Sequence, residues 1–260
     1  MKIKQFALNH FETNCYVLWD EESKQCVIVD PCAETTYEEA QVTQYIDEKG
    51  LRPKYILLTH AHVDHIAGLP QMCERYGLPV TMHADGKKLL RQAEAYGAVM
   101  GFMVESMEGL PVNEVGEDDE LEVGKEKMIC RCVPGHCPGS LAYVVPSAEV
   151  VLTGDALFRG SIGRTDLPGG DYNLLIEKIR TRLLTLPDDY EVLPGHGEPR
   201  LSERTSRASQ RNSPSCRCSP RIRRASRSSS RRRHCSHSPP SGSRASTHCG
   251  FRPRRRCPRP

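Results

Sequence analysis

The sequence predicts an α+β fold in which layers of β-sheet are covered by helices, followed by a segment too polar to form a core. Three observations support this prediction. Short apolar runs alternate with amphipathic helical patterns through residues 1–199. Several strand-like runs precede the first helical pattern, which a simple doubly wound sheet does not accommodate well. Beyond this region the large apolar residues are reduced to Leu201, Ile222 and Phe251.

Charge divides the chain at the same point. Residues 1–199 carry 18 basic and 32 acidic residues, a net charge of −14, and are long enough to bury a core. Residues 200–260 carry 18 Arg, no Lys and the single acid Glu203, a net charge of +17. The net charge of +3 for the whole chain is therefore an average over two unlike regions. We predict a folded domain over residues 1–199 and a disordered basic tail over residues 200–260.

Short apolar runs predict strands throughout the domain. Because these runs alternate with helical patterns, layers of sheet covered by helices are favoured. The predicted strands are Lys2–Phe6, Cys15–Trp19, Cys26–Asp30, Tyr55–Leu58, Val80–His83, Met128–Val133, Ala142–Val145, Val150–Thr153 and Glu191–Leu193.

Helices are predicted where apolar residues recur at helical spacing between start and stop signals. Thr36 followed by Glu39 forms a capping box, and Gly50 ends the helix that follows. Asp171 begins another helix, whose apolar stripe continues until Pro187. Shorter helices are predicted over Leu69–Tyr76 and Gly86–Tyr96.

Neither a membrane segment nor a signal peptide is predicted. No stretch approaches the ~20 apolar residues of a membrane helix, and polar residues interrupt the first 20 positions. The expected location is therefore the cytoplasm, where thiols stay reduced. Several cysteines lie in or beside apolar runs, which favours buried thiols over disulfides. These are Cys15, Cys26, Cys32 and Cys73.

The strongest chemical signal is the run THAHVDH at residues 59–65, directly after a predicted strand. His60 and His62 are two residues apart, so on extended backbone they point to the same side. Asp64 and His65 follow after the chain turns, so they can face a second point. Imidazole and carboxylate are ligands that zinc accepts. Such a density of these side chains indicates a metal site.

Three further candidate ligands follow other predicted strands. His136 lies in a loop rich in Gly and Pro, Asp155 follows Gly154, and His196 lies between two glycines. Each alone is typical of a loop residue. Together with the run at residues 59–65 they form a set of polar ligands delivered by four strand ends, as in a site at the edge of packed sheets.

These motifs resemble those of the metallo-β-lactamase superfamily, and the resemblance covers residues 1–199. It implies a four-layer αβ/βα sandwich with a site for two Zn²⁺ between the sheets, with iron and manganese as alternatives. It also implies that Asp30 orients the site from behind the ligands, although a turn-capping role is the alternative. The implied ligands are His60, His62 and His136 for the first metal, Asp64, His65 and His196 for the second, and Asp155 between both.

The resemblance further implies hydrolysis by a metal-bound hydroxide, with Asp64 and Asp155 as catalytic carboxylates. Two dications about 3.5–4 Å apart lower the pKa of a shared water and polarise the carbonyl under attack. No Ser or Cys nucleophile is then required. Cys137, beside His136, is expected to pack in the interior, with contact to the first metal as the alternative.

Residues 154–166 resemble the glyoxalase II branch of hydroxyacylglutathione hydrolases and its short bacterial relatives. The implied reaction is hydrolysis of a small thioester to an acid and a thiol. Full-length glyoxalase II has a helical domain that supplies part of the glutathione site, and the residues after His196 do not resemble it. A thioester other than one of glutathione is therefore an alternative.

Two other enzyme classes remain open. Residues 163–166 also resemble persulfide dioxygenases, which use one iron at the first site, and a lactonase is the third alternative. Arg164 and Asp166 within this stretch either contact substrate or form a salt bridge inside the loop.

The tail raises a non-enzymatic alternative. A polycation of this kind can bind RNA or other polyanions through phosphate contacts, but the tail lacks regular aromatic residues for stacking on bases. Its 18 Arg and no Lys contrast with 8 Arg and 10 Lys in the domain, which is typical of GC-rich coding sequence read out of frame. We therefore expect the tail to be out-of-frame sequence and the partner to be a small-molecule thioester, with neither a membrane nor a specific nucleic acid as partner.

Overall fold

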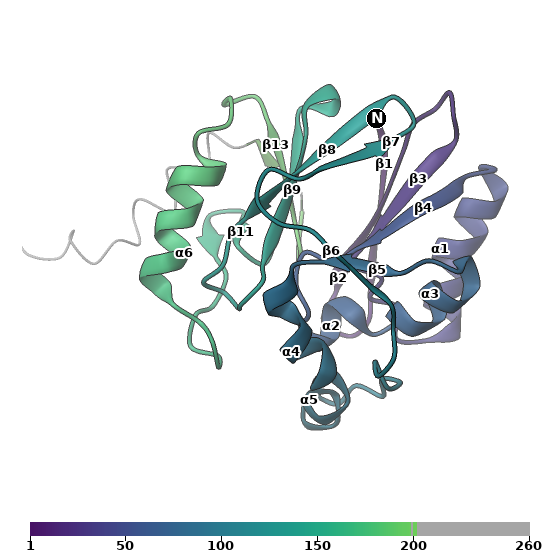
Figure 1. Ribbon diagram of the computed structural model, residues 1–260, viewed down its shortest axis with the longest axis horizontal. Coiled ribbons are helices and arrows are strands. Elements are labelled where there is room, and N and C mark those ends of the chain that lie inside the picture. The colour runs from purple at the N-terminus through teal and green to yellow at the C-terminus, as the bar shows by residue number, and fades with distance from the viewer. Residues whose placement is uncertain (199, 202–260) are drawn as a thin grey trace, which may run out of the picture. The chain divides into compact units, whose positions relative to one another are not determined.

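A computed structural model describes residues 1–198 and 200–201. These residues form the predicted α+β sandwich, in which two sheets pack face to face and helices cover their outer faces (Figure 1). Of the tail predicted over residues 200–260, Arg200–Leu201 forms a short strand. The predicted disorder of the remainder lies outside the described residues.

The first sheet has the strand order β1-β2-β3-β4-β5-β6. β1, β2 and β3 pair antiparallel, whereas β3, β4, β5 and β6 pair parallel. β2 is buried on both faces, because Val17 packs towards the helices and Leu18 towards the other sheet. The strands are β1 (Lys2–Leu8), β2 (Thr13–Trp19), β3 (Gln25–Val29), β4 (Arg52–Leu57), β5 (Val80–Met82) and β6 (Val112–Glu114).

The second sheet has the order β14-β13-β10-β9-β8-β7 and is antiparallel except between β10 and β13. A small hairpin, β11 with β12, stands beside it. The strands are β7 (Glu120–Val123), β8 (Glu126–Cys132), β9 (Leu141–Val145), β10 (Val150–Gly154), β11 (Leu157–Phe158), β12 (Ser161–Ile162), β13 (Glu191–Pro194) and β14 (Arg200–Leu201).

Helices cover both outer faces of the sandwich. Figure 1 shows α1 and α3 beyond the first sheet and α6 beyond the second. One apolar core lies under each outer helical layer and a third lies between the sheets, which confirms the four-layer architecture. The helices are α1 (Thr36–Glu48), α2 (Val63–Ile66), α3 (Leu69–Tyr76), α4 (Lys87–Arg91), α5 (Ala93–Met100) and α6 (Tyr172–Lys178).

Most predicted elements are confirmed, and the errors have local causes. The capping box uses Thr35 and Glu38, one residue before the predicted pair, because Thr35 is the residue with extended backbone. The helix predicted over Gly86–Tyr96 is two helices, α4 and α5, which meet at Gln92. Asp30 was assigned to a strand but follows β3 with a φ of 52°. The short strands β6, β7, β11, β12 and β14 were missed because they offer few apolar residues.

The described residues agree with the predictions about the cysteines and about membrane-spanning segments. All seven cysteines described are free, and the four predicted to be buried are buried. None of the helices in this part of the chain is both long and apolar enough to cross a bilayer.

The capping box stabilises the start of α1 and also binds the loop between β1 and β2. The Glu38 carboxylate accepts hydrogen bonds from the backbone N–H groups of Asn9 (2.7 Å), Glu34 (2.9 Å) and Thr35 (3.0 Å). The Thr35 hydroxyl in turn accepts a hydrogen bond from the N–H of Glu38. The helix start is therefore coupled to a loop that contributes to the functional site.

We predict that Thr35→Ala lowers the free energy of unfolding by about 1 kcal/mol, because the side chain that caps the helix is lost. Thr36→Ala is the matched control: Thr36 is also exposed, lies in the first turn and provides no cap. Urea denaturation of both variants measures the difference. Equal destabilisation by the two substitutions would contradict this assignment of the cap.

Candidate metal centre

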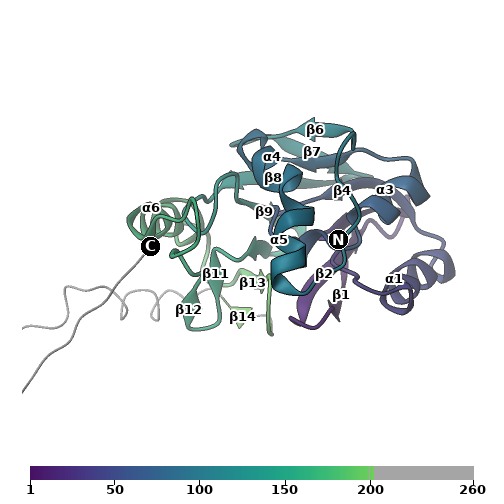
Figure 2. The same cartoon turned by 90° about the horizontal axis from the view of Figure 1, so that it is seen from below.

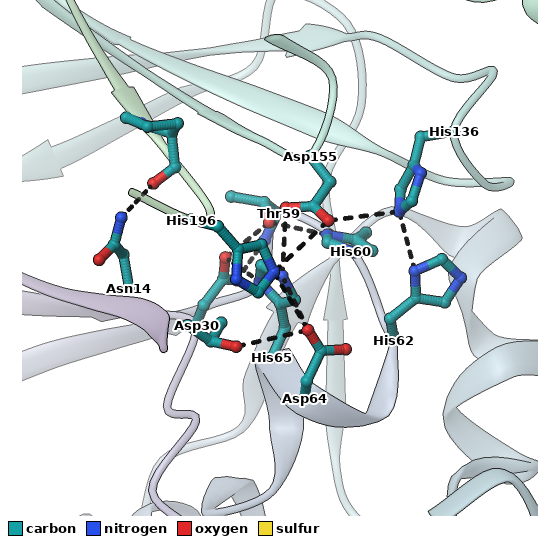
Figure 3. A network of polar contacts seen from close by, with 12 residues as sticks. Asn14, Asp30, Thr59, His60, His62, Asp64, His65, His136, Asp155 and His196 are labelled. Atoms are coloured by element: carbon teal, nitrogen blue, oxygen red, sulfur yellow. Dashed lines mark hydrogen bonds and ion pairs between the residues drawn. The ribbon is translucent and has the colours of Figure 1, made fainter. Parts of the chain in front are cut away.

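The candidate ligands come together where strands of both sheets end. Asp30 follows β3 and His60 follows the neighbouring parallel strand β4. Asp155 follows β10 and His196 follows its parallel neighbour β13. His136 lies in the loop between β8 and β9. Because parallel strands end at the same edge of a sheet, the first four side chains converge between the two sheets, and the β8–β9 loop brings His136 to them (Figure 3).

A first cluster contains His60, His62 and His136, as predicted. Their potential ligand atoms, together with the sulfur of Cys137, all lie within 4.8 Å of one another. His62 Nδ1 and His136 Nε2 are only 2.9 Å apart. Cys137 is fully buried and its sulfur lies 3.4 Å from the hydroxyl oxygen of Ser140. It therefore packs in the interior and also borders the first cluster.

A second cluster contains Asp64, His65 and His196, again as predicted. The short helix α2 turns the chain directly after His62, which brings Asp64 and His65 to the second cluster while the ring of His65 stays 4.1 Å from that of His60. Asp64 Oδ2 lies 3.2 Å from His196 Nε2 and 3.6 Å from His65 Nε2. The cluster thus joins a loop of the first sheet to a loop of the second.

Asp155 stands between the two clusters. Its Oδ1 lies 3.3 Å from His65 Nε2, and its Oδ2 lies 3.6 Å from Nε2 of both His136 and His196. Figure 3 shows its carboxylate between His136 on one side and His196 on the other. One carboxylate therefore faces histidines of both clusters, the position expected for a group shared by two cations.

Hydrogen bonds from behind fix the direction of the imidazole rings. Nδ1 of His136 donates to the carbonyl of Arg164 (2.7 Å), and Nδ1 of His196 donates to the carbonyl of Phe11 (3.1 Å). Nδ1 of His65 donates to the carboxylate of Asp30 (2.9 Å). Since Nδ1 of each ring is engaged from behind, Nε2 is the nitrogen that faces the site and can act as a ligand when it carries no proton.

Asp30 supports both clusters at once. Its Oδ1 accepts a hydrogen bond from the N–H of Thr59 (2.7 Å), and its Oδ2 accepts one from the Thr59 hydroxyl (2.6 Å) as well as the one from His65. The Thr59 oxygen lies 3.1 Å from His60 Nδ1 and can accept a hydrogen bond from it. Asp30 thus orients one histidine of each cluster, which matches the orienting role implied by the resemblance rather than a turn cap alone.

The first cluster is electrically neutral. Burial lowers the pKa of His60 well below its usual range, and the neighbouring imidazoles of His65 and His62 lower it further. Burial, with the nearby His136, lowers the pKa of His62 to about 4. Burial also lowers the pKa of His136, against the opposing effect of Asp155. Neutral imidazoles are the form that binds a cation.

The second cluster carries charge of both signs. Burial opposes ionisation of Asp64 and Asp155, but the imidazole of His65 holds the pKa of both below the usual range. Burial would lower the pKa of His65, yet the carboxylates of Asp155 and Asp64 raise it well above its usual value. Protons on the histidines thus balance the carboxylates, and a divalent cation can take their place.

Buried polar atoms without a hydrogen-bond partner indicate whether these residues suit a metal ion. His60 Nε2, His65 Nε2 and one oxygen of Asp155 are buried and have no hydrogen-bond partner. Buried polar atoms are nearly always satisfied in folded proteins. Here the three atoms belong to candidate ligands and border the space between the clusters. A cation in each cluster would satisfy them, so the donor set fits a pair of metal ions.

Sequence reasoning missed several polar residues around the site. The Asn9 side chain donates to the carbonyl of Asp64 (2.8 Å), and the Thr13 hydroxyl lies 3.4 Å from Asp64 Oδ2. The sequence gives no distinctive signal for the positive φ of Asn9 or for the role of the Thr59 hydroxyl, because the residues that these two side chains contact are distant along the chain.

Arg164 and Asp166 form a bidentate salt bridge at 2.8 and 2.7 Å. The loop salt bridge weighed from the sequence is therefore present.

Gly195 allows the two sheets to approach at the site. A Cβ on this residue would overlap the Asp155 carboxylate and lie 2.7 Å from His65 Cε1. Gly195→Ala is therefore expected to displace Asp155 or His196 and to weaken metal binding at least about tenfold. Gly116→Ala is the control, since a Cβ there meets no atom within 4 Å. Calorimetric titration of the metal-free variants with Zn²⁺ measures this, and equal affinities would refute the steric argument.

Comparisons with known proteins agree with this geometry. Residues 8–196 match the metallo-beta-lactamase superfamily. Over 198 residues the chain is 41% identical to the probable metallo-hydrolase YqgX of Bacillus subtilis, covering 76% of this chain and 90% of the relative. It is 35% identical to hydroxyacylglutathione hydrolase GloC of Haemophilus influenzae, covering 76% of this chain and 91% of the relative.

Two further proteins are also similar to this chain. The crystal structure of TTHA1623 in a di-iron-bound form is similar with a TM-score of 0.71 and 33% identity, covering 79% of this chain and 98% of that one. The mouse mitochondrial persulfide dioxygenase ETHE1 is 31% identical, covering 71% of this chain and 63% of the relative. Since the fold, the His/Asp clusters and the sequence matches agree, this chain belongs to the metallo-β-lactamase superfamily and is a metal-dependent hydrolase of that family.

Proposed function

We propose that the chain hydrolyses a small thioester with two Zn²⁺ ions. The observation that carries this proposal is the pair of clusters that share Asp155, because a group placed between two histidine-rich clusters suits two cations and not one. In the proposal the seven residues predicted from the sequence are the metal ligands. Those residues are His60, His62, Asp64, His65, His136, Asp155 and His196.

Each group of residues has a distinct role in this proposal. When bound, two cations activate a water molecule as nucleophile and stabilise the negative charge that develops on a carbonyl oxygen. Asp64 and Asp155 supply the negative charge that keeps the two cations close together. Asp30 and Thr59 hold the imidazoles in the direction that the clusters require, through the hydrogen bonds described above. The β1–β2 loop fixes His196 through the carbonyl of Phe11.

A thioester suits this site for two reasons. The similarity to GloC, whose name describes hydrolysis of a glutathione thioester, supports this bond type. A thiol with a pKa of ~8.5 also leaves readily as its anion when the thioester bond breaks. The leaving group therefore needs no dedicated proton donor. Among the described residues, the charged side chains that line the cavity are those of the clusters and Arg164, which is paired with Asp166.

The alternative enzyme is a persulfide dioxygenase with one iron at His60, His62 and His136. The similarity to ETHE1 favours it. The second cluster favours hydrolysis, because an enzyme with one metal at the first cluster does not need Asp64 and His196 with their ligand atoms 3.2 Å apart.

We propose Zn²⁺ as the metal because neutral imidazole and carboxylate suit it. Iron is the alternative, which the di-iron form of TTHA1623 supports. A cytoplasmic location and a small molecule as the specific partner complete the proposal.

The first prediction from this proposal concerns metal content. Protein purified without added metal is expected to contain close to two metal ions per chain and to hydrolyse lactoylglutathione or a simpler thioester. Elemental analysis together with detection of the released thiol measures both. One iron per chain, together with oxygen uptake in the presence of a persulfide, would replace the hydrolase by the dioxygenase.

The second prediction separates the two clusters. His60→Ala is expected to empty mainly the first position and Asp64→Ala mainly the second, and each is expected to reduce hydrolysis by orders of magnitude because both cations act on the water. His83→Ala serves as control, since His83 lies outside the clusters. Metal content and thiol release are measured for each variant. Near-normal hydrolysis by Asp64→Ala would show that one metal suffices.

A further inference from the structure

A cavity of about 390 Å³ opens beside the metal clusters and has two unlike walls. One wall contains cluster residues, among them His62, Asp155 and His196. The other wall is mainly apolar and comes mostly from α5, with Leu89 from α4. Figure 2 shows these helices on the near side of the molecule, along the edge where the sheets meet. The apolar wall is defined here as Phe11, Leu89, Tyr96, Val99 and Met100.

This wall holds most of the large hydrophobic side chains that are exposed in the described residues. Six large hydrophobic side chains are exposed in this part of the chain, and four of them line this one cavity. Their exposed fractions are 39% for Phe11, 40% for Tyr96, 82% for Val99 and 45% for Met100. Apolar residues scattered singly over a surface are ordinary, but a group gathered at one cavity marks a binding surface.

Close packing holds the wall in place against the metal clusters. A Cβ on Gly97 of α5 would lie 2.9 Å from Val104 and 3.4 Å from Val63, so α5 packs tightly against the segment after it and is in contact with α2, which carries Asp64. On the other side, the ring of Phe11 packs edge-on against Phe102, with centroids 5.2 Å apart. The Phe11 carbonyl also accepts the hydrogen bond from His196. A group bound on the wall is thus held at a defined place relative to the clusters.

The charges around the cavity are already paired. Arg164 is the one Lys or Arg side chain that lines it within the described residues, and its guanidinium is bound by both oxygens of Asp166. The two lining carboxylates, Asp64 and Asp155, belong to the metal clusters. A charged substituent of the substrate that moved from water to this wall would lose hydration and find no oppositely charged partner there. An uncharged apolar substituent would lose little hydration free energy.

We propose that the substrate carries an uncharged apolar substituent, on its acyl or its thiol side, and that the apolar wall selects it. This inference rests on the proposed thioester hydrolysis and specifies the class of thioester. Val99 and Tyr96 act as specificity-determining residues, because they contact the part of the substrate that does not react. A lactoyl group, which is short and hydroxylated, gains little from such a wall.

The test uses two series of thioesters with the full-length, metal-loaded protein. In the first, the acyl group on N-acetylcysteamine is lengthened from acetyl to hexanoyl, with lactoyl included; in the second, the alkanethiol of an acetyl thioester is lengthened from ethane- to hexanethiol. In one series kcat/KM is expected to rise about threefold for each methylene. Flat profiles in both series, or faster turnover of lactoyl than of butyryl, would overturn the inference.

Two matched variants assign the effect to the wall. Val99→Asn is expected to reduce the ratio of kcat/KM for hexyl over ethyl chains severalfold in the responding series. Met103→Asn is the control, because Met103 is 94% exposed and does not line the cavity. A chain-length dependence that both variants preserve, or that both lose, would place the apolar contact elsewhere.

Binding of the products separates this inference from the proposed function. Calorimetry compares hexanoate with acetate and hexanethiol with ethanethiol on the metal-loaded protein, and needs no turnover. Tighter binding of the longer product that Val99→Asn abolishes supports the apolar wall even if no thioester is cleaved, in which case only the proposed function fails. Thioester cleavage with equal binding of long and short products refutes the wall and leaves the hydrolase in place.

Discussion

The buried carboxylate of Asp155 is the point on which the rest of the site depends. It lies within 3.6 Å of the imidazoles of His65, His136 and His196, so it joins helix α2, the β8–β9 loop and the segment after β13. Ions of opposite charge buried at such distances interact strongly because little water screens them. Gly163 and Gly195 allow the approach, since a Cβ on either would overlap Asp155. Both sheets are therefore held in the one arrangement that brings the clusters together.

Asp30 and Thr59 extend this constraint into the first sheet. Asp30 lies directly after β3 with a φ of 52°, an uncommon backbone conformation that its hydrogen bonds to Thr59 and His65 stabilise. Through these bonds one carboxylate orients a histidine of the neutral cluster and one of the charged cluster. The two clusters can thus differ in protonation while their geometry is fixed by the same residue.

The helix α2 connects the chemistry of the site to its selectivity. In four residues it carries Asp64 and His65 on one side, while Val63 packs towards α5 and Phe102 on the other. A movement of α5 would therefore disturb the second cluster, and loss of that cluster would loosen the apolar wall. Specificity and metal binding therefore share a structural element, and Leu90 and Ala93 also fix the wall to the core under the first sheet.

The sequence alone determined the fold class, most of the strands and all seven candidate ligands. It could do so because apolar periodicity is local, and because the run at residues 59–65 places four of the seven ligands within six positions. Tertiary structure alone decided what lies around them. Glu38 rather than Glu39 closes the capping box because the cap depends on the backbone conformation of Thr35. Contacts with residues distant along the chain decide the roles of Thr59, Phe11 and the wall of α4 and α5. Such contacts produce no periodic pattern in a single sequence.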